Sequence, residues 1–438
     1  MRNEIRVIAD LDFPGAHTLL ETFDTAVASA SPARCLTPDQ IPSGDLLVLG
    51  AGKAAASMAV MVNRHATGSV RGFVVTRYGH GLQPGEDAGA IEVVESGHPH
   101  PDEKSAAAGS KLLELAATLR SRETLLFLAS GGASSLAAAP LGDVTLEQKR
   151  RIADFLMRDG ADIRDINCVR RHLSAIKGGR LARIAHPAPV ITLAISDVPG
   201  DAIGDIGSGP TIVDPTTGAE ALSILERHQV PGCEALASQL RDPRFESPKP
   251  GDADFAADRA VIVATAKTAI DEAAAYLSQC GVPVRRLGED LTDEAHELGR
   301  EHARLARSAV ETGEPLALLS GGETRVKVRS SGGRGGRNLE YLAGLAIGLD
   351  GLKNVVALAA DTDGIDGSGG HAGALVTPDI LRTGRDAGVD MQTQLSKNDT
   401  YIFFQACKLL VETGPTRTNV NDFRLILINP MAVEPALV

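Results

Sequence analysis

Short apolar runs that end in glycine and lead into helical periodicity recur along the chain. Examples are "DLLVLGAGKAAASMAVMV", "TLLFLASGGASSLAAAP", "PVITLAISDVPGDAIGDIGSGP" and "NVVALAADTDGIDGS". The runs are rich in Leu, Val and Ile and lack polar alternation, which is typical of strands buried on both faces of a parallel sheet. Apolar periodicity predicts helices over residues 102–119 and 291–311. Strands that alternate with helices predict an α/β protein with largely parallel, helix-covered sheets.

The composition of the chain changes between residues 240 and 258. This stretch, "LRDPRFESPKPGDADFAAD", is rich in Pro and Asp and poor in aliphatic residues, as expected of a linker. A chain of 438 residues is long enough for two domains that each bury a core. We therefore predict an N-terminal domain over 1–240, a linker over 241–254 and a C-terminal α/β domain over 255–438.

The charge balance and the cysteines restrict the partners and the compartment. Lys and Arg number 44 against 56 Asp and Glu, so the net charge is −12. This charge argues against nucleic acid or an anionic membrane surface as a partner. The five cysteines are widely spaced and include no CxxC pair, which suits reduced thiols. Because there is no apolar leader and no apolar run near ~18 residues, we expect a cytoplasmic protein.

One stretch departs from this acidic background. Residues 320–340 read "SGGETRVKVRSSGGRGGRNLE", with six glycines and five basic side chains, directly after the apolar run "PLALL". Cationic groups on a glycine-rich loop can receive a small, multiply charged anion, and nucleotide phosphates fit that description. We interpret the stretch as an anion-binding loop.

Within this loop the basic residues fall into two groups. Arg325, Lys327 and Arg329 alternate with valines, which predicts a strand or ribbon with one basic face. Arg334 and Arg337 stand on a glycine scaffold, from which a guanidinium can reach phosphate oxygens in bidentate geometry. Asn338 is expected to cap the helix that follows.

Glycine pairs follow two of the apolar runs. Glycine lets the backbone approach a ligand closely, and ligands of open α/β sheets bind beyond the carboxyl ends of the strands. Both pairs have hydroxyl neighbours, so both loops are candidate binding loops. Their residues are Gly131, Gly132, Ser130 and Ser134 in the first loop and Gly321, Gly322, Ser320 and Thr324 in the second.

The loop "GAGKAAASM" supports two interpretations. Gly50, Gly52 and Ala55 fit the G-x-G-x-x-A fingerprint of dinucleotide binding, and Arg77 after the next apolar run could meet a 2′-phosphate. That pattern favours an NAD(P)-dependent reductase. Lys53, however, falls inside the turn, where a cation suits a transferring phosphoryl group. The sequence leaves both open at this point.

Acidic residues also follow apolar runs. "AADTDGIDGSGGHAG" places Asp361, Asp363 and Asp366 after one run, either as a Mg²⁺ or nucleotide site or as ordinary Asp-Gly turns. Asp197, Asp201 and Asp205 follow the run "VITLAI", and Asp197, near the strand end, is the candidate base or metal ligand among them. Glu323, beside a glycine pair, is a further candidate metal ligand.

Cationic loops and strand-end carboxylates together are the two halves of phosphoryl-transfer chemistry. Positive groups and Mg²⁺ offset charge on the transferring group, and a carboxylate orients the attacking hydroxyl. Composition and spacing therefore favour an ATP- and Mg²⁺-dependent enzyme that acts on a small hydroxylated substrate. The alternatives are the NAD(P)-dependent reductase and a non-catalytic sensor of phosphorylated metabolites built from the same loops.

Several motifs taken together resemble a known family, the glycerate 2-kinases of the MOFRL type, many of which carry the label hydroxypyruvate reductase. The resemblance spans nearly the whole chain in order. It rests on "GAGKAA", "YGHG", "ESGHPHPDEKS", "SGGASSL", "NCVRRHLSAIKGGRLA", "ISDVPGDAIGDIGSGPTIVDPT", "LSGGETRV", "GGRGGRNLE", "ADTDGIDGSGGHAGA", "NDTYIFF" and "TGPTRTNVNDF".

This resemblance implies phosphorylation of D-glycerate to 2-phospho-D-glycerate, with ATP and Mg²⁺, in a cleft between a Rossmann-like domain and a MOFRL-like α/β domain. A monomer or homodimer is expected. The residue roles that it implies are as follows: catalytic Lys53, Asp197 and Arg337; glycerate-binding Ser130, Gly131, Gly132 and Ser134; nucleotide-binding Ser320, Gly321, Gly322, Thr324, Asp363 and Asn421; and metal-binding Glu323 and Asp361.

A few positions depart from the pattern expected of the family. Arg77 replaces a common Lys, Leu339 a common Gln, and Arg417 a common Gly in the C-terminal loop. We expect His80, His98 and His100 to be structural, with a substrate role for His98 as the alternative.

Overall fold

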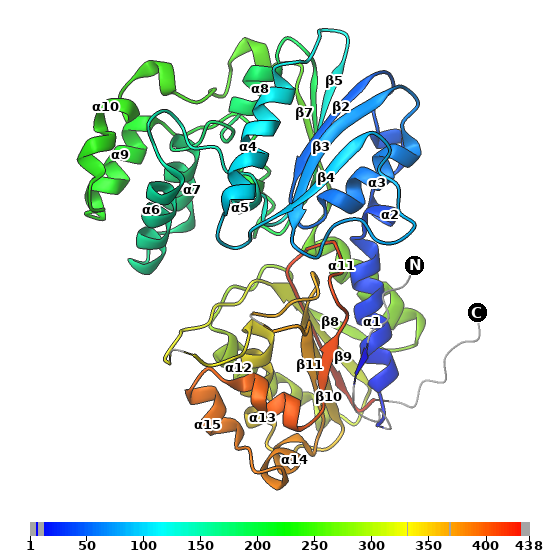
Figure 1. Ribbon diagram of the computed structural model, residues 1–438. Helices are drawn as coiled ribbons and strands as arrows, with labels where there is room; N and C mark the ends of the chain where they lie inside the picture. The colour runs from blue at the N-terminus through cyan, green and yellow to red at the C-terminus, as the bar shows by residue number, and fades with distance from the viewer. Residues whose placement is uncertain (1–5, 8–12, 331, 368, 431–438) are drawn as a thin grey trace. The chain divides into compact units, whose positions relative to one another are not determined.

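The computed structural model describes residues 6–7, 13–330, 332–367 and 369–430 (Figure 1). Contacts divide the chain into two compact units, Pro32–Val263 and a second unit made of Met1–Ser31 with Ala264–Val438. We call them the parallel-sheet unit and the mixed-sheet unit after their sheets.

The parallel-sheet unit is built on a six-stranded sheet in the order β4-β3-β2-β5-β6-β7. The pairings from β4 to β6 are parallel, as the unbroken apolar runs predict. The strand bounds are β2 Leu46–Ala51, β3 Val70–Arg77, β4 Ile91–Ser96, β5 Thr124–Ala129, β6 Val190–Ile195 and β7 Arg259–Ala264.

Helices of this unit form two groups. Those packed on the sheet share a core with it, whereas the others form a separate helical cluster with its own apolar core. Figure 1 shows this cluster, α6, α7, α9 and α10, beside α4 and α5. The helix bounds are α2 Pro32–Cys35, α3 Ala55–His65, α4 Glu103–Ala116, α5 Ala133–Leu136, α6 Leu146–Arg158, α7 Ile163–His172, α8 Arg180–Ala185, α9 Gly218–Arg227 and α10 Ala237–Leu240.

The mixed-sheet unit contains a seven-stranded sheet in the order β1-β12-β11-β10-β13-β9-β8. Only the β8–β9 pairing is parallel, and the others are antiparallel. The α/β architecture is thus confirmed, but the second sheet is not largely parallel. Central strands of either kind are apolar on both faces, so the sequence pattern does not distinguish them. The bounds are β1 Arg6–Val7, β8 Val284–Gly288, β9 Leu316–Gly322, β10 Val355–Asp361, β11 Gly373–Val376, β12 Leu410–Glu412 and β13 Asp422–Ile428.

Helices cover the mixed sheet, and one of them comes from the start of the chain. Helix α1 contacts α11, β10 and β13 (Figure 1). The ring of Phe23 lies 5.7 Å from that of Phe423. The bounds are α1 Ala16–Ser29, α11 Ala266–Gln279, α12 Ala295–Val310, α13 Arg337–Leu349, α14 Ile380–Asp386, α15 Met391–Ser396 and α16 Thr400–Ala406.

The segment 241–254, expected to link two domains, lies within the parallel-sheet unit. It is fastened there by side chains: Arg180 donates to the carbonyl of Phe245 at 2.7 Å, and His172 contacts Glu246 at 3.0 Å. Its polar composition thus serves contacts with the body of that unit.

The two expected helices are present, but two other local expectations are wrong. Helix α4 begins after Asp102, which accepts a hydrogen bond from the Ser105 amide at 2.8 Å, and α12 begins at Ala295. Residues 325–329 do not form a strand, because only Arg325 makes a β-bridge and side chains bind the rest of the loop. Asn338 is not a cap, since α13 begins one residue earlier, at Arg337.

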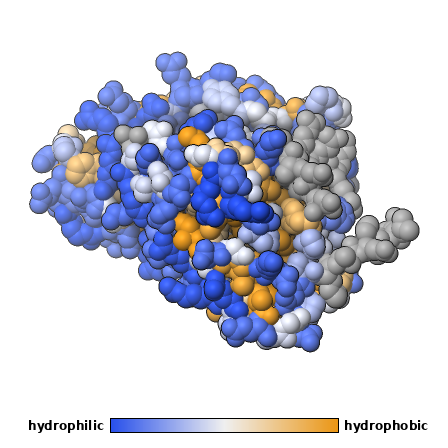
Figure 2. All heavy atoms as spheres, turned by 90° about the horizontal axis from the view of Figure 1, so that it is seen from below, coloured by the Kyte–Doolittle hydropathy of each residue, from blue (hydrophilic) through white to orange (hydrophobic). Residues whose placement is uncertain are grey.

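Among the described residues no helix has the length and apolarity needed to cross a bilayer. The face seen in Figure 2 is mostly hydrophilic, with smaller hydrophobic groups between the polar ones.

Candidate active site

The loops after β2, β5 and β6 leave the parallel sheet at one edge. These strands are neighbours, and their ends are in register, with Ala51 opposite Ala129 and Ala129 opposite Ala194. The loop residues Lys53, Ser130 and Asp197 therefore emerge from three adjacent strand ends. The sequence prediction that strand-end loops gather these residues is consistent with this arrangement.

Backbone hydrogen bonds join the Lys53 loop to the Ser130 loop. The amide of Lys53 donates to the carbonyl of Gly131 at 2.8 Å, and the amide of Ala54 donates to Ser130 Oγ at 3.0 Å. Gly52 adopts φ +140°, and a Cβ there would overlap Ser130 Oγ. Only glycine fits at this position, and the two loops form one rigid edge with Lys53 only 9% exposed.

Ser134 lies just beyond the glycine pair and contacts two other segments. Its Oγ is 2.8 Å from the Ser208 hydroxyl and accepts a hydrogen bond from Lys177 Nζ at 2.5 Å. Gly132 adopts φ +82°, and a Cβ on it would lie 2.9 Å from the His98 ring. His98 thus packs against the predicted glycerate-binding loop.

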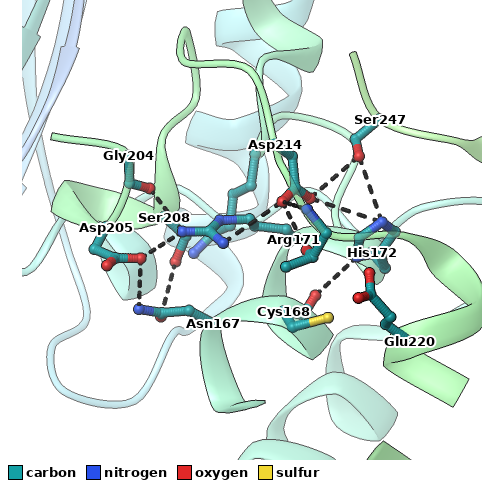
Figure 3. A network of polar contacts seen from close by, with 12 residues as sticks. Asn167, Cys168, Arg171, His172, Gly204, Asp205, Ser208, Asp214, Glu220 and Ser247 are labelled. Carbon is teal, nitrogen blue, oxygen red and sulfur yellow. Dashed lines mark hydrogen bonds and ion pairs between the residues drawn. The ribbon is translucent and has the colours of Figure 1, made fainter. Parts of the chain in front are cut away.

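A polar network on helix α7 holds the segment after β6 (Figure 3). Arg171 donates to the Gly204 carbonyl at 3.0 Å and forms an ion pair with Asp205, which also accepts from Asn167 at 3.1 Å. Asp214 lies 3.5 Å from the same guanidinium. Arg171 and Asn167 therefore position the loop that carries Asp197 and Ser208, a role that sequence reasoning missed.

In the mixed-sheet unit the second candidate group forms where β9 and β10 end and β13 begins. Gly322 is opposite Asp422, and Asp422 is opposite Asp361. Since β13 is antiparallel to both neighbours, its first residue lies at the same edge as their last residues. This brings Glu323, Asp361 and Asp422 together.

Arg337, the first residue of α13, pairs with all three carboxylates. Its guanidinium contacts Glu323, lies 2.9 Å from Asp361 Oδ2 and lies 3.4 Å from Asp422 Oδ1. Burial alone would lower the pKa of Arg337, but the charges of Asp422, Asp361 and Glu323 raise it well above the ordinary value. The guanidinium is thus a fixed positive charge, and Glu323, with 44% of its side chain exposed, is its most accessible partner.

Asp422 is the acidic residue that sequence reasoning missed. It is buried, pairs with Arg424 at 2.6 Å and accepts from Asn338 Nδ2 at 2.9 Å. The sequence did contain a signal for it, because Asp422 directly precedes the largely apolar run "FRLILI". The rule that ligand-binding residues follow strand ends does not cover an acid at the start of a strand.

Asp366 has a structural role. It accepts hydrogen bonds from the amides of Asn338 at 3.2 Å and Leu339 at 3.0 Å, so it fixes the start of α13. Burial, followed by the charge of Asp422, raises the pKa of Asp366 to about 7.

Most of the predicted nucleotide-binding residues are buried and stabilise this edge of the sheet. Ser320 and Thr324 are buried, and Arg424 donates to the Gly321 carbonyl at 2.7 Å. Gly322 adopts φ +105° against the backbone of Leu291. Asp363 accepts from the Ile365 amide at 2.7 Å, and the carbonyl of Asn421, which has φ +68°, accepts from Thr362 at 2.7 Å. All of these residues lie close, along the chain or across the sheet, to Arg337 and its three carboxylate partners, which we call the Arg337 cluster.

Another group with metal-ligand chemistry lies at α12 and α13, beside the basic loop 325–334. Glu294, His296 and Glu340 each offer one ligand atom, and these atoms lie within 4.8 Å of one another. Glu294 already accepts from the Lys327 amide at 3.1 Å and lies 3.6 Å from Arg329. The protein's own donors thus satisfy Glu294, and this group fastens the basic loop to α12 and α13.

Comparisons with known proteins show which family the chain resembles. Residues 18–241 match a domain of unknown function, DUF4147, and residues 316–422 match the MOFRL family. The chain is 45% identical over 425 residues, 95% of each chain, to an Agrobacterium vitis protein named putative hydroxypyruvate reductase. It is 37% identical over 388 residues to the D-glycerate 2-kinase of Thermotoga maritima, covering 87% of this chain and 90% of that protein.

The solved structures show the same fold. The crystal structure of glycerate kinase from Thermotoga maritima matches with a TM-score of 0.82 and 34% identity, covering 94% of this chain and 99% of that one. A protein from Pyrococcus horikoshii matches with a TM-score of 0.76 and 29% identity, covering 96% and 100%. The chain therefore belongs to the MOFRL family, together with proteins named glycerate 2-kinase and hydroxypyruvate reductase.

Proposed function

We propose that this protein is a glycerate 2-kinase, which transfers a phosphoryl group from ATP to the 2-hydroxyl of D-glycerate in a Mg²⁺-dependent reaction. The relatives named for this activity cover most of the chain. The observation that carries the proposal is the set of carboxylates around Arg337 at one sheet edge. Phosphoryl transfer requires oxygen ligands for a divalent ion and a fixed cation for the transferring group.

The residues of this edge fit Mg²⁺. Glu323 and Asp361 would hold it, and their donors are carboxylate oxygens, as this hard cation requires. The carboxylates of Glu323, Asp361 and Asp422 outnumber the guanidiniums of Arg337 and Arg424, so negative charge is left for a cation to offset. When bound, Mg²⁺ neutralises charge on the β- and γ-phosphates.

The nucleotide would lie against the same edge. We assign its contacts to the segment from Ser320 to Thr324, to Asp363 and to Asn421, because they flank the Arg337 cluster. Arg337 would bind the transferring phosphoryl group, since its guanidinium keeps its charge among the carboxylates.

The acceptor would bind at the edge of the parallel sheet. The segment 130–134 would hold the carboxylate of D-glycerate, which presents the 2-hydroxyl to Asp197. Asp197 would accept the hydroxyl proton while the oxygen attacks the γ-phosphorus and the bond to the bridging oxygen breaks, so that ADP leaves. Lys53 would stabilise the negative charge that develops on the phosphoryl oxygens.

One observation counts against the dinucleotide-binding alternative. In the G-x-G-x-x-A fingerprint, the turn and the start of the helix present free amides to a pyrophosphate. Here the amides of Gly52, Lys53 and Ala54 donate to Val75 O, Gly131 O and Ser130 Oγ. The amides of this turn therefore already have acceptors within the protein and are not free for a pyrophosphate, which favours the kinase.

The test is an enzyme assay on purified protein. D-glycerate, ATP and Mg²⁺ should give 2-phospho-D-glycerate, and omission of Mg²⁺ should abolish the product. Product phosphorylated only at carbon 3 would refute the proposed position of transfer. Oxidation of NADPH by hydroxypyruvate would instead support the reductase, and ligand-dependent melting without turnover would support a sensor.

A further inference from the structure

Lys177 is a buried lysine beside the predicted glycerate-binding loop. It lies between α7 and α8 and is only 1% exposed. Its ammonium donates to Ser134 Oγ at 2.5 Å and to the Ser134 carbonyl at 2.9 Å. Burying an ammonium group against neutral partners alone is costly, because the lost hydration is not replaced by an opposite charge.

The charges around Lys177 make this cost larger. Lys149 on α6 and Arg170 and Arg171 on α7 are the neighbouring cations, and after burial itself they lower the pKa of Lys177 well below its ordinary value. Burial, followed by Arg170 and Arg180, lowers the pKa of Lys149 to about 7. Two buried lysines therefore lie close to each other and to arginines, and this proximity disfavours their charged forms.

The carboxylates in this region form ion pairs with arginine. Asp205 and Asp214 pair with Arg171. Among the described residues no carboxylate forms an ion pair with Lys177 or Lys149, and the buried Nζ of Lys149 has no hydrogen-bond partner there. An anion placed beside these lysines would offset their positive charge.

We propose that Lys177, together with Ser134, binds the carboxylate of the acceptor, so that short 2-hydroxy acids are selected over neutral polyols. This assignment rests on the proposed function, which puts the acceptor at the same loop. A compact ammonium and a hydroxyl that already contact each other both donate to a carboxylate that approaches between them. Lys149, Arg170 and Arg171 add positive potential behind Lys177 and do not contact the ligand.

The proposal has a consequence for protons. An anion beside Lys177 favours the charged ammonium, so binding of the carboxylate raises the pKa of Lys177 and is coupled to proton uptake. A lysine with a merely structural role makes the same contacts with and without ligand and takes up none.

The experiment measures binding by the full-length protein without nucleotide. Calorimetric titration with D-glycerate and with glycerol, which lacks the carboxylate, is compared for the unmodified protein, Lys177→Met and the control Lys111→Met. Lys111 is exposed on α4 and pairs with Glu114 at 3.7 Å. We expect Lys177→Met to weaken D-glycerate binding by about 30-fold or more, to leave glycerol binding unchanged and to abolish the buffer-dependent heat of proton uptake. Lys111→Met should resemble the unmodified protein.

Ser134→Ala supplies a second variant in case Lys177→Met does not fold. It removes only a hydroxyl and should weaken D-glycerate binding by roughly tenfold, again without an effect on glycerol. Unchanged D-glycerate affinity in either folded variant overturns the proposal. If D-glycerate binds as expected but is not phosphorylated, the proposed function fails while the carboxylate site stands. If Lys177→Met instead phosphorylates D-glycerate normally with an unchanged KM, the carboxylate site fails while the proposed function stands.

Discussion

Asp422 illustrates how single residues of this protein depend on partners that are distant in sequence. Its buried carboxylate pairs with Arg424 two positions away on the same strand and with Arg337 on helix α13, and it accepts from Asn338. Arg424 is itself almost fully buried. An uncompensated arginine in such a place costs far more than an exposed ion pair contributes.

Replacing Asp422 with Asn should therefore destabilise the protein strongly. The variant keeps the shape of the side chain but leaves Arg424 and Arg337 without one carboxylate, at an expected cost of about 3 kcal/mol in the free energy of unfolding. Denaturant titration measures this cost. The control Asp379→Asn breaks an exposed pair with Arg382 at 2.8 Å and should change stability by less than about 0.5 kcal/mol. Equal effects of the two substitutions would refute the argument.

His302 allows a second prediction about a single residue, which concerns the pH dependence of stability. It is buried on α12 and contacts the Tyr341 hydroxyl at 2.8 Å, and burial, followed by the charge of Arg424, lowers its pKa to about 4. Because the unfolded chain binds this proton near pH 6.5, the unfolded state holds more protons between about pH 4 and 6.5. Stability should accordingly fall as the pH falls through this window.

His302→Gln should remove part of that fall, up to about 3 kcal/mol at pH 4. Unfolding free energies measured at several pH values test it, with His17→Gln, an exposed position on α1, as the control. A pH dependence that is the same in both variants would show that His302 does not contribute.

At the scale of elements, the start of helix α13 sets the position of Arg337. The helix begins against Asp366, which accepts the amides of Asn338 and Leu339. Gly336 makes this approach possible, because a Cβ on it would overlap the Asp366 carboxylate. One glycine thus determines how closely the loop after β10 can cap the helix.

Gly336→Ala should displace Asp366 from the helix start. We expect a loss of about 1–3 kcal/mol of stability and a lower kcat, because Arg337 is the first residue of that helix. The control Gly370→Ala adds a methyl group where no atom lies within 4 Å. Melting curves and turnover of both variants provide the comparison, and a fully active, stable Gly336→Ala protein would contradict the role given to this glycine.

The structure explains why sequence reasoning found part of each site at this scale. In the parallel sheet, strand ends share one edge, so the loops that the sequence predicts to carry Lys53, Ser130 and Asp197 do leave the sheet together. In the mixed sheet, the same rule overlooked Asp422, because an antiparallel strand begins where its neighbours end. Lys177 was overlooked because its burial follows from contacts with Ser134, 43 positions earlier.

At the scale of the whole molecule, the proposed reaction gives Lys53 and Arg337 a role on the same phosphoryl group. Lys53 belongs to the parallel-sheet unit and Arg337 to the mixed-sheet unit. Groups that stabilise the same transition state do not contribute independently, because removing one changes what the other can do.

Kinetics of a double variant test this requirement. Lys53→Ala and Arg337→Ala should each lower kcat by about 10²-fold or more, and the double variant should lose less than the product of the two effects. Lys111→Ala combined with either one serves as the additive control. If the two losses multiply fully, Lys53 and Arg337 act on separate events, and their shared role is refuted.

The sequence alone determined the α/β class, the glycine loops at strand ends and membership of a family, because apolar periodicity and local turn chemistry are properties of neighbouring residues. The tertiary structure decided which charges meet: Arg337 with Asp422, Arg171 with Asp205, and Lys177 with Ser134. Strand direction and burial set these pairs, and both depend on how distant segments pack rather than on any local pattern.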